Sequence, residues 1–135
     1  MEEYDVTLLE LDSQNVLPAV VSADEEGDVI ALTLRLGEET FTGRAESYLE
    51  AYQAMRDALL RRGYGLRCAG SRRNAVQSAM MAYVPKIYLV TCGRQALRGD
   101  IVSIWETCDL RTFPDTQAQN QFRDQWYDSL RRQEG

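Results

Sequence analysis

A short polar segment in the middle of the chain carries residue types that could hold an anion. Residues 68–74 read Cys-Ala-Gly-Ser-Arg-Arg-Asn, and Ser78 follows a little further on. Guanidinium groups and polar side chains around a glycine can surround a phosphate or carboxylate where a strand meets a helix. One candidate site, for an anionic ligand, is therefore Arg72, Arg73, Asn74 and Ser78. The competing interpretation is structural: Gly70 permits a tight turn, and the arginines pair with acidic residues of the N-terminal region.

The sequence offers little for catalysis. It contains no histidine, the commonest general base and metal ligand, and Lys86 is its single lysine. Adjacent carboxylates such as Glu25 and Glu26, or Glu38 and Glu39, are expected in turns, where they stay hydrated and are poorly suited to acid–base catalysis. The three cysteines lack metal-binding spacing, and we expect each to be a small buried apolar residue. Neither standard glycine-rich nucleotide loop is present. We predict no catalytic residue, no metal and no cofactor.

Charge is divided unevenly along the chain. Residues 1–50 contain thirteen Asp or Glu against two Arg, a net charge of -11, whereas residues 51–135 have a net charge of +5. An acidic region of this kind can attract a cationic partner, with a strength that falls as salt rises. The alternative is a solvated acidic surface that keeps a small protein soluble.

Turns in the first third of the chain concentrate this acidity. We expect the turn carboxylates to form one exposed patch that binds a partner, and the candidate partner-binding residues are Asp24, Glu25, Glu26, Asp28, Glu38 and Glu39. The arginines of residues 61–73 could suggest nucleic acid, but a net charge of -6 and a pI near 4.7 argue against it. We therefore expect no nucleic acid partner.

The elements that position these residues follow from hydrophobic patterning. Alternating apolar residues predict strands over residues 4–11, 16–21, 29–36 and 40–42, joined by turns into an antiparallel meander, with Pro18 favouring a sheet edge. Further strands are predicted over residues 64–69, 86–91 and 101–107. Residues 75–84 suggest a short helix that Pro85 stops.

Two longer helices are predicted. Ser47 and Glu50 have capping-box spacing ahead of an apolar stripe, and Gly63 is placed to end that helix. Thr116 and Gln119 have the same spacing ahead of a C-terminal helix with an aromatic stripe formed by Phe122, Trp126, Tyr127 and Leu130. The expected fold class is α+β: a β-meander, a long central helix, further strands that complete the sheet, and a C-terminal helix.

Length and hydropathy favour a single domain over residues 1–135. No apolar run approaches the roughly 18 residues of a transmembrane helix, and the N-terminus does not resemble a signal peptide. The sequence therefore predicts a cytoplasmic protein with no membrane partner.

A pattern over about 80 residues is familiar. Ser-Tyr-Leu-Glu-Ala opens the helix at residue 47, C-x-G-S-R-x-N spans residues 68–74, S-x-M begins at Ser78, and D-I-V-x-I-W begins at Asp100, before an aromatic helix. This resembles a group of small uncharacterised bacterial proteins. In size, acidity and lack of a catalytic set, such proteins are similar to the immunity proteins that accompany polymorphic or contact-dependent growth inhibition toxins.

Three functional hypotheses follow. The first is an immunity protein whose acidic surface docks on a basic toxin domain, plausibly a nuclease, and blocks its active site without turnover. The second is a small enzyme or ligand-binding domain that uses the anion site described above. The third is a homodimeric module with Trp105 or Trp126 at the interface, so monomer and homodimer both remain open.

Overall fold

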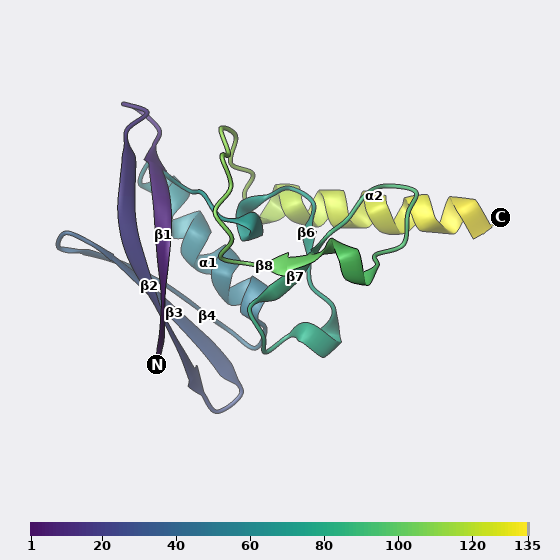
Figure 1. The fold of residues 1–135 in the computed structure, drawn as a ribbon, viewed down its shortest axis with the longest axis horizontal. Helices are drawn as coiled ribbons and strands as arrows, with labels where there is room; N and C mark the ends of the chain where they lie inside the picture. Colours follow the sequence, from purple (N-terminus) through teal and green to yellow (C-terminus); the bar gives the residue numbers. More distant parts are fainter. Residues whose placement is uncertain (135) are drawn as a thin grey trace.

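Four antiparallel strands open the chain and form most of one sheet. The computed structural model describes residues 1–134 and has an α+β fold (Figure 1). The strands of the first sheet are β1 (Glu2–Glu10), β2 (Val16–Glu26), β3 (Val29–Leu36), β4 (Glu39–Ala45) and β5 (Tyr64–Leu66), in the order β4-β3-β2-β1-β5. The predicted meander is confirmed, although the second strand extends five residues further than its pattern indicated.

Alternation fixes which face of this sheet is buried. Ile30, Leu32 and Leu34 of β3 point into the core, with exposures of 1% or less. The edge prediction for Pro18 is wrong for the strand as a whole, because β2 lies between β1 and β3. The prediction is correct for the segment around Pro18, which pairs with β1 alone because β2 pairs with β3 only from Val21 onward.

Helix α1 (Tyr48–Arg61) covers the buried face, as its stripe predicted. The Ser47 hydroxyl accepts from the Glu50 amide at 3.3 Å, and Gly63 follows the helix with a φ of +88°. The helix approaches β4 so closely at Gly43 that a Cβ there would lie 1.9 Å from the Ala51 carbonyl oxygen. Glycine is therefore required at this crossing.

Of the predicted further strands, β5 joins the first sheet, whereas the others belong to a second, smaller sheet. It has the order β6-β7-β8, formed by Ala75–Val76, Lys86–Leu89 and Ile101–Ser103. The predicted helix over residues 75–84 is wrong: β6 is followed only by a 3-10 turn at Ala79–Met81. Strand pairing with β7 prevails here over the local helix propensity, because Ala75 and Val76 pair with β7. Asn74 adds to this pairing, since its backbone and its side chain both form hydrogen bonds with Val90.

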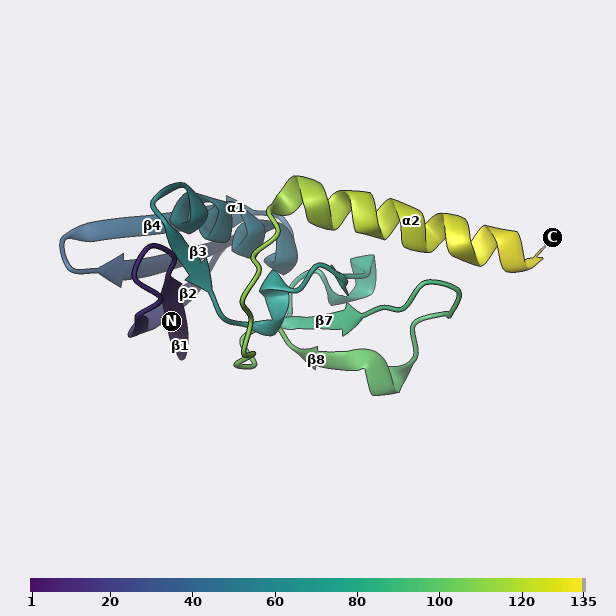
Figure 2. The same cartoon turned by 90° about the horizontal axis from the view of Figure 1, so that it is seen from above.

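Helix α2 (Thr116–Glu134) starts beside α1 and extends over the second sheet (Figure 2). Its first turns meet α1, and further along Trp126 packs with Val76 and Val90 in a second apolar cluster. The predicted Thr116 and Gln119 capping box is wrong, because Asp115 accepts from the Ala118 amide at 2.9 Å and Gln119 turns inward. Within residues 1–134, neither helix is long and apolar enough to cross a membrane.

Candidate functional site: an acidic end of the sheet and a polar groove

The six predicted partner-binding carboxylates do not form one patch. Four lie at the β2–β3 turn (Asp24, Glu25, Glu26 and Asp28), whereas Glu38 and Glu39 lie at the β3–β4 turn, at the opposite end of β3 (Figure 1). Eight residues of strand separate the two turns by about 23 Å. This is well over twice the screening length of about 8 Å at physiological salt. The two groups therefore act as separate charges, and the expectation of a single patch is corrected.

Arginines neutralise one carboxylate in each group. Arg44 lies 2.7 Å from Glu26, and Arg62 makes a two-pronged contact with Glu39 at 2.8 and 2.9 Å. Hydrogen bonds from these guanidinium groups lower the pKa values of both glutamates. Within residues 1–134, Glu25, Asp28 and Glu38 form no ion pair, and Asp24 has only the N-terminal ammonium at 3.8 Å.

Further carboxylates, which the sequence pattern did not indicate, lie at the same end of the sheet as the β2–β3 turn. The register pairs Glu2 with Ala23 and Ala45 with Ile30, which brings the start of β1 and the end of β4 to the same end of the sheet. We call the resulting group of exposed carboxylates the acidic end: Glu2, Glu3, Asp24, Glu25, Glu26, Asp28 and Glu46. Hairpin register carries this signal, because in a four-stranded meander the start of the first strand, the second turn and the end of the fourth strand fall at one end.

Beside these carboxylates lies a hollow of about 550 Å³, which we call the tyrosine hollow. It is lined by Glu2, Asp24 and Glu25 together with Tyr4, Tyr48 and Tyr83. Tyr4 stacks on Trp105 with ring centroids 5.3 Å apart, and the Tyr48 hydroxyl accepts from the Trp105 indole at 3.0 Å. Two of the three tyrosines are thus fixed by the core.

Both fixed tyrosines keep their phenolic protons at neutral pH. Burial, with a hydrogen bond to Glu2, raises the pKa of Tyr4. Burial also raises the pKa of Tyr48, and the nearby charges of Glu2 and Glu25 add to the shift. The hollow therefore combines carboxylates, neutral phenols and aromatic rings, which together suit a cation.

Apolar side chains are exposed on the loop that supplies Tyr83 and Val84 to the lining of the hollow. Met80 is 98% exposed, and Tyr83 and Val84 are 52% and 42% exposed. The loop that carries them is well anchored: the Gln77 amide donates to Val84 and Lys86 carbonyls at 3.1 and 2.9 Å, and the Tyr48 amide donates to Ala82 at 2.6 Å. We call Met80, Tyr83 and Val84 the apolar loop.

The predicted anion-binding residues are not brought together. Arg72 and Arg73 are exposed, and Arg73 lies over the Phe122 ring at 5.7 Å. The Asn74 amide donates to the Val90 carbonyl, which is a structural role. The alternative pairing with the acidic region is also wrong, since neither arginine forms an ion pair with any residue of the described chain. Only Ser78 lines a cavity.

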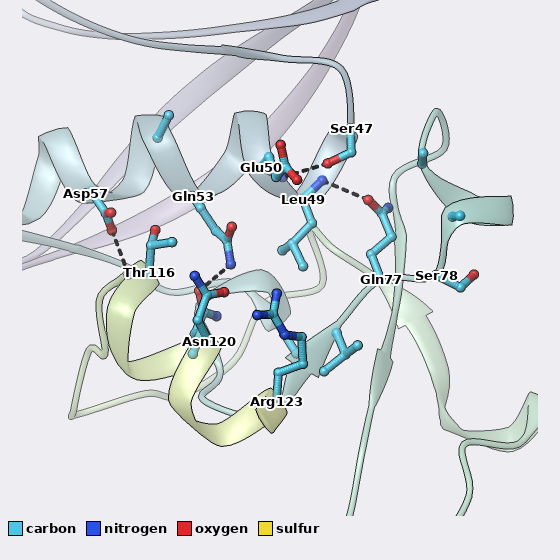
Figure 3. Close-up of a pocket in the computed structure, with 16 residues that line it drawn as sticks. Ser47, Leu49, Glu50, Gln53, Asp57, Gln77, Ser78, Thr116, Asn120 and Arg123 are labelled. Atoms are coloured by element: carbon cyan, nitrogen blue, oxygen red, sulfur yellow. Dashed lines mark hydrogen bonds between the residues drawn. The ribbon is translucent and has the colours of Figure 1, made fainter. Parts of the chain in front are cut away.

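That cavity is a polar groove of about 560 Å³ between α1, α2 and the segment 75–82, which we call the groove (Figure 3). Its polar lining comes from α1, from the segment and from α2: Ser47, Glu50, Gln53, Asp57, Gln77, Ser78, Thr116, Gln119, Asn120 and Arg123. Positions 50, 53 and 57 share one face of α1, and positions 116, 120 and 123 share one face of α2. Helical spacing could have indicated each stripe, although not that the two face each other.

A buried network beneath the groove joins the helices. The Gln119 carbonyl oxygen accepts from Arg56 at 2.7 Å and from Gln53 at 3.0 Å, while its amide donates to the Gly70 and Arg72 carbonyls at 2.8 and 2.7 Å. Arg56 is 0% exposed and also bonds Asp57 at 2.8 Å. Gln119 therefore ties α1, α2 and the residue 70–72 turn together.

The tryptophans and cysteines differ in part from their predicted places. Trp105 and Trp126 are 5% and 7% exposed within the two apolar clusters, so both are used in internal packing. Cys68 is buried as expected, but Cys92 is exposed and Cys108 is half-buried. All three are free thiols.

No protein-family model matches this sequence, and no curated protein is significantly similar to it.

Proposed function

We propose that this protein binds a basic protein through its acidic end, in the manner of an immunity protein that neutralises a bacterial toxin, plausibly a nuclease. The partner would place a cationic side chain in the tyrosine hollow, and the bound protein would cover the partner's active site. The proposal involves no turnover. It places the protein in the cytoplasm, where a nuclease toxin would act.

The observation that supports this proposal most strongly is the concentration of charge. Seven exposed carboxylates gather at one end of the sheet, where Arg44 and the N-terminal ammonium pair with Glu26 and Asp24. Such a potential speeds the encounter with a cationic partner, often by tenfold or more at low salt. Glu38 and Glu39, at the far end of β3, lie outside this surface.

The chemistry of the tyrosine hollow supports a cationic side chain as its occupant. A guanidinium or ammonium group there would meet the carboxylates of Glu2, Asp24 and Glu25 and the faces of aromatic rings. Arginine fits this combination best because its flat guanidinium both stacks on rings and forms two-pronged bonds with carboxylates.

The apolar loop supports a protein partner over a small cation. Exposed apolar side chains that are anchored in one conformation lose little entropy on binding and commonly contribute most of the affinity at an interface. Met80, Tyr83 and Val84 would therefore slow dissociation, while the carboxylates speed association.

Triarginine is a defined probe for the charged part of this surface. In a ¹⁵N NMR titration we expect the largest shifts at Glu2, Asp24, Glu25 and Tyr83, declining as salt is raised. A triple variant, Glu2→Gln with Asp24→Asn and Glu25→Gln, should weaken binding at least tenfold. The matched control removes the same charge from exposed positions elsewhere: Asp12→Asn, Glu38→Gln and Glu106→Gln. Equal binding by the two triple variants would contradict the proposal.

Immunity itself requires a cellular assay. The protein is co-expressed with the product of the reading frame beside its own gene, and growth is compared for the wild type and the two triple variants. We expect the control variant to protect the cells and the acidic-end variant to protect them poorly. Equal protection by both would mean that another surface binds the toxin, and the absence of protection by the wild type would refute the immunity role.

A further inference from the structure

The groove floor holds a hydrogen-bond acceptor, the side-chain oxygen of Gln53, to which no described residue donates. Its orientation follows from Gln119, whose amide nitrogen donates to the Gly70 and Arg72 carbonyls and whose oxygen accepts from Arg56. Only this orientation suits two carbonyls and a guanidinium. Gln53 must therefore present its own amide nitrogen to the Gln119 oxygen, at 3.0 Å.

The Gln53 carbonyl oxygen consequently faces away from Gln119 and into the groove (Figure 3). The Gln53 residue is only 7% exposed, and its oxygen accepts no hydrogen bond from any residue of the described chain. The oxygen reaches the open groove, where water or the N–H or O–H group of a ligand can donate to it. The floor of the groove can therefore accept a hydrogen bond from a ligand.

Glu50 adds a negative charge next to this oxygen. It lies one turn before Gln53 on α1, lines the groove and forms no ion pair among residues 1–134. Asp57, one turn further on, is already occupied by Arg56 and by the Thr116 amide at 3.2 Å. The wall formed by α1 therefore offers an acceptor pair, Glu50 and Gln53, that suits an ammonium group.

The wall formed by α2 offers donors. Asn120 and Arg123 lie one turn apart, and Figure 3 shows both in the lining of the groove. The Asn120 side chain makes no hydrogen bond within residues 1–134, and Arg123 has only long contacts of 3.3 and 3.4 Å to its neighbour Asp124. An amide and a guanidinium at this spacing suit a carboxylate.

We propose that the groove is a binding site for a small zwitterion, with its ammonium group on Glu50 and Gln53 and its carboxylate on Asn120 and Arg123. This site is separate from the acidic end and does not depend on the proposed function. The remaining lining is small and apolar, including Leu49, Ala54 and Val76, which suits short aliphatic side chains. An extended dipeptide spans about 7 Å, close to the edge of about 8 Å of a cube of the groove's volume.

L-Alanyl-L-alanine is the probe that matches these features, and isothermal titration calorimetry measures its binding to the full-length protein. N-Acetyl-dialanine lacks the ammonium group, and dialanine amide lacks the carboxylate. We expect each blocked peptide to bind at least tenfold more weakly than dialanine, because each loses a hydrogen bond between charged groups. L-Alanine is too short to reach both walls and should also bind more weakly.

Variants locate the site. Glu50→Gln and Arg123→Gln should each weaken dialanine binding at least tenfold, whereas the exposed control Arg131→Gln on the same helix should not change it. Thermal unfolding of each variant checks that the fold is intact. The proposal is overturned if dialanine fails to bind the wild type at millimolar concentration, if the blocked peptides bind as well, or if the stable Glu50 and Arg123 variants bind like the wild type.

Discussion

Replacing Gln119 tests whether a polar network, rather than apolar packing, holds α2 against α1. Gln119→Ala removes four hydrogen bonds, two accepted from Arg56 and Gln53 and two donated to backbone carbonyls. It also leaves the fully buried Arg56 with fewer partners. Each of the three neutral hydrogen bonds contributes about 1 kcal/mol, and the one to the charged Arg56, which keeps its bond to Asp57, contributes about 1.5 kcal/mol. We therefore expect the free energy of unfolding to fall by about 4 kcal/mol.

Urea denaturation followed by tryptophan fluorescence measures this loss. With a denaturant dependence of about 2 kcal/mol per molar, the midpoint should fall by about 2 M. Gln119→Leu separates the two possible causes, because it restores most of the side-chain volume but none of the hydrogen bonds. A polar origin predicts a similar loss for both variants.

The matched control is Gln117→Ala, at an exposed position two residues away on α2, which should change the midpoint little. Recovery of stability in Gln119→Leu would show that the cavity, not the network, causes the loss. A change below about 1 kcal/mol in both Gln119 variants would refute the role assigned to the network.

Two further predictions concern the core. Gly43→Ala should destabilise the protein by about 3 kcal/mol or more, because the added Cβ would meet the Ala51 oxygen and the Met55 amide of α1. The control in the same urea assay is Gly99→Ala, where the added Cβ meets open space. Burial, with a smaller effect of Cys108, raises the pKa of the Cys68 thiol from 9.0 to about 12. The thiol thus ionises first in the unfolded chain, so its contribution to stability is complete below pH 9 and is lost as pH rises towards 12. Unfolding measured across this range should show a smaller decline in Cys68→Ala, and an equal decline would contradict the assignment.

Local patterns were sufficient for the first half of the fold. The turns and alternation of residues 2–45, and the capping box at Ser47, depend on neighbours in sequence, and the structure confirms the meander and α1. In the second sheet, the patterns over residues 86–91 and 101–107 indicated β7 and β8, which end earlier than predicted, whereas β6 has two residues and is too short to carry a pattern. Residues 75 and 76 are strand because β7 lies beside them, and that information is not local.

The candidate sites show the same limit. The six acidic residues were selected by composition, and the register of β3 then divides them between two ends of the sheet. Gln119 has capping spacing in the sequence, but its partners come from residues 53, 56, 70 and 72. A side chain whose partners lie so far away cannot be assigned a role from its own helix.

The contact at Gly43 determines what kind of surface the molecule offers. Because backbone meets backbone there, α1 cannot slide along β4, and Tyr48 at the start of the helix stays in register with the strand ends that carry Asp24 and Glu25. The surface proposed to bind the partner is thus preformed. A partner of complementary shape would bind this surface without any rearrangement of α1 or the sheet. A partner of another shape would have to change its own conformation to bind.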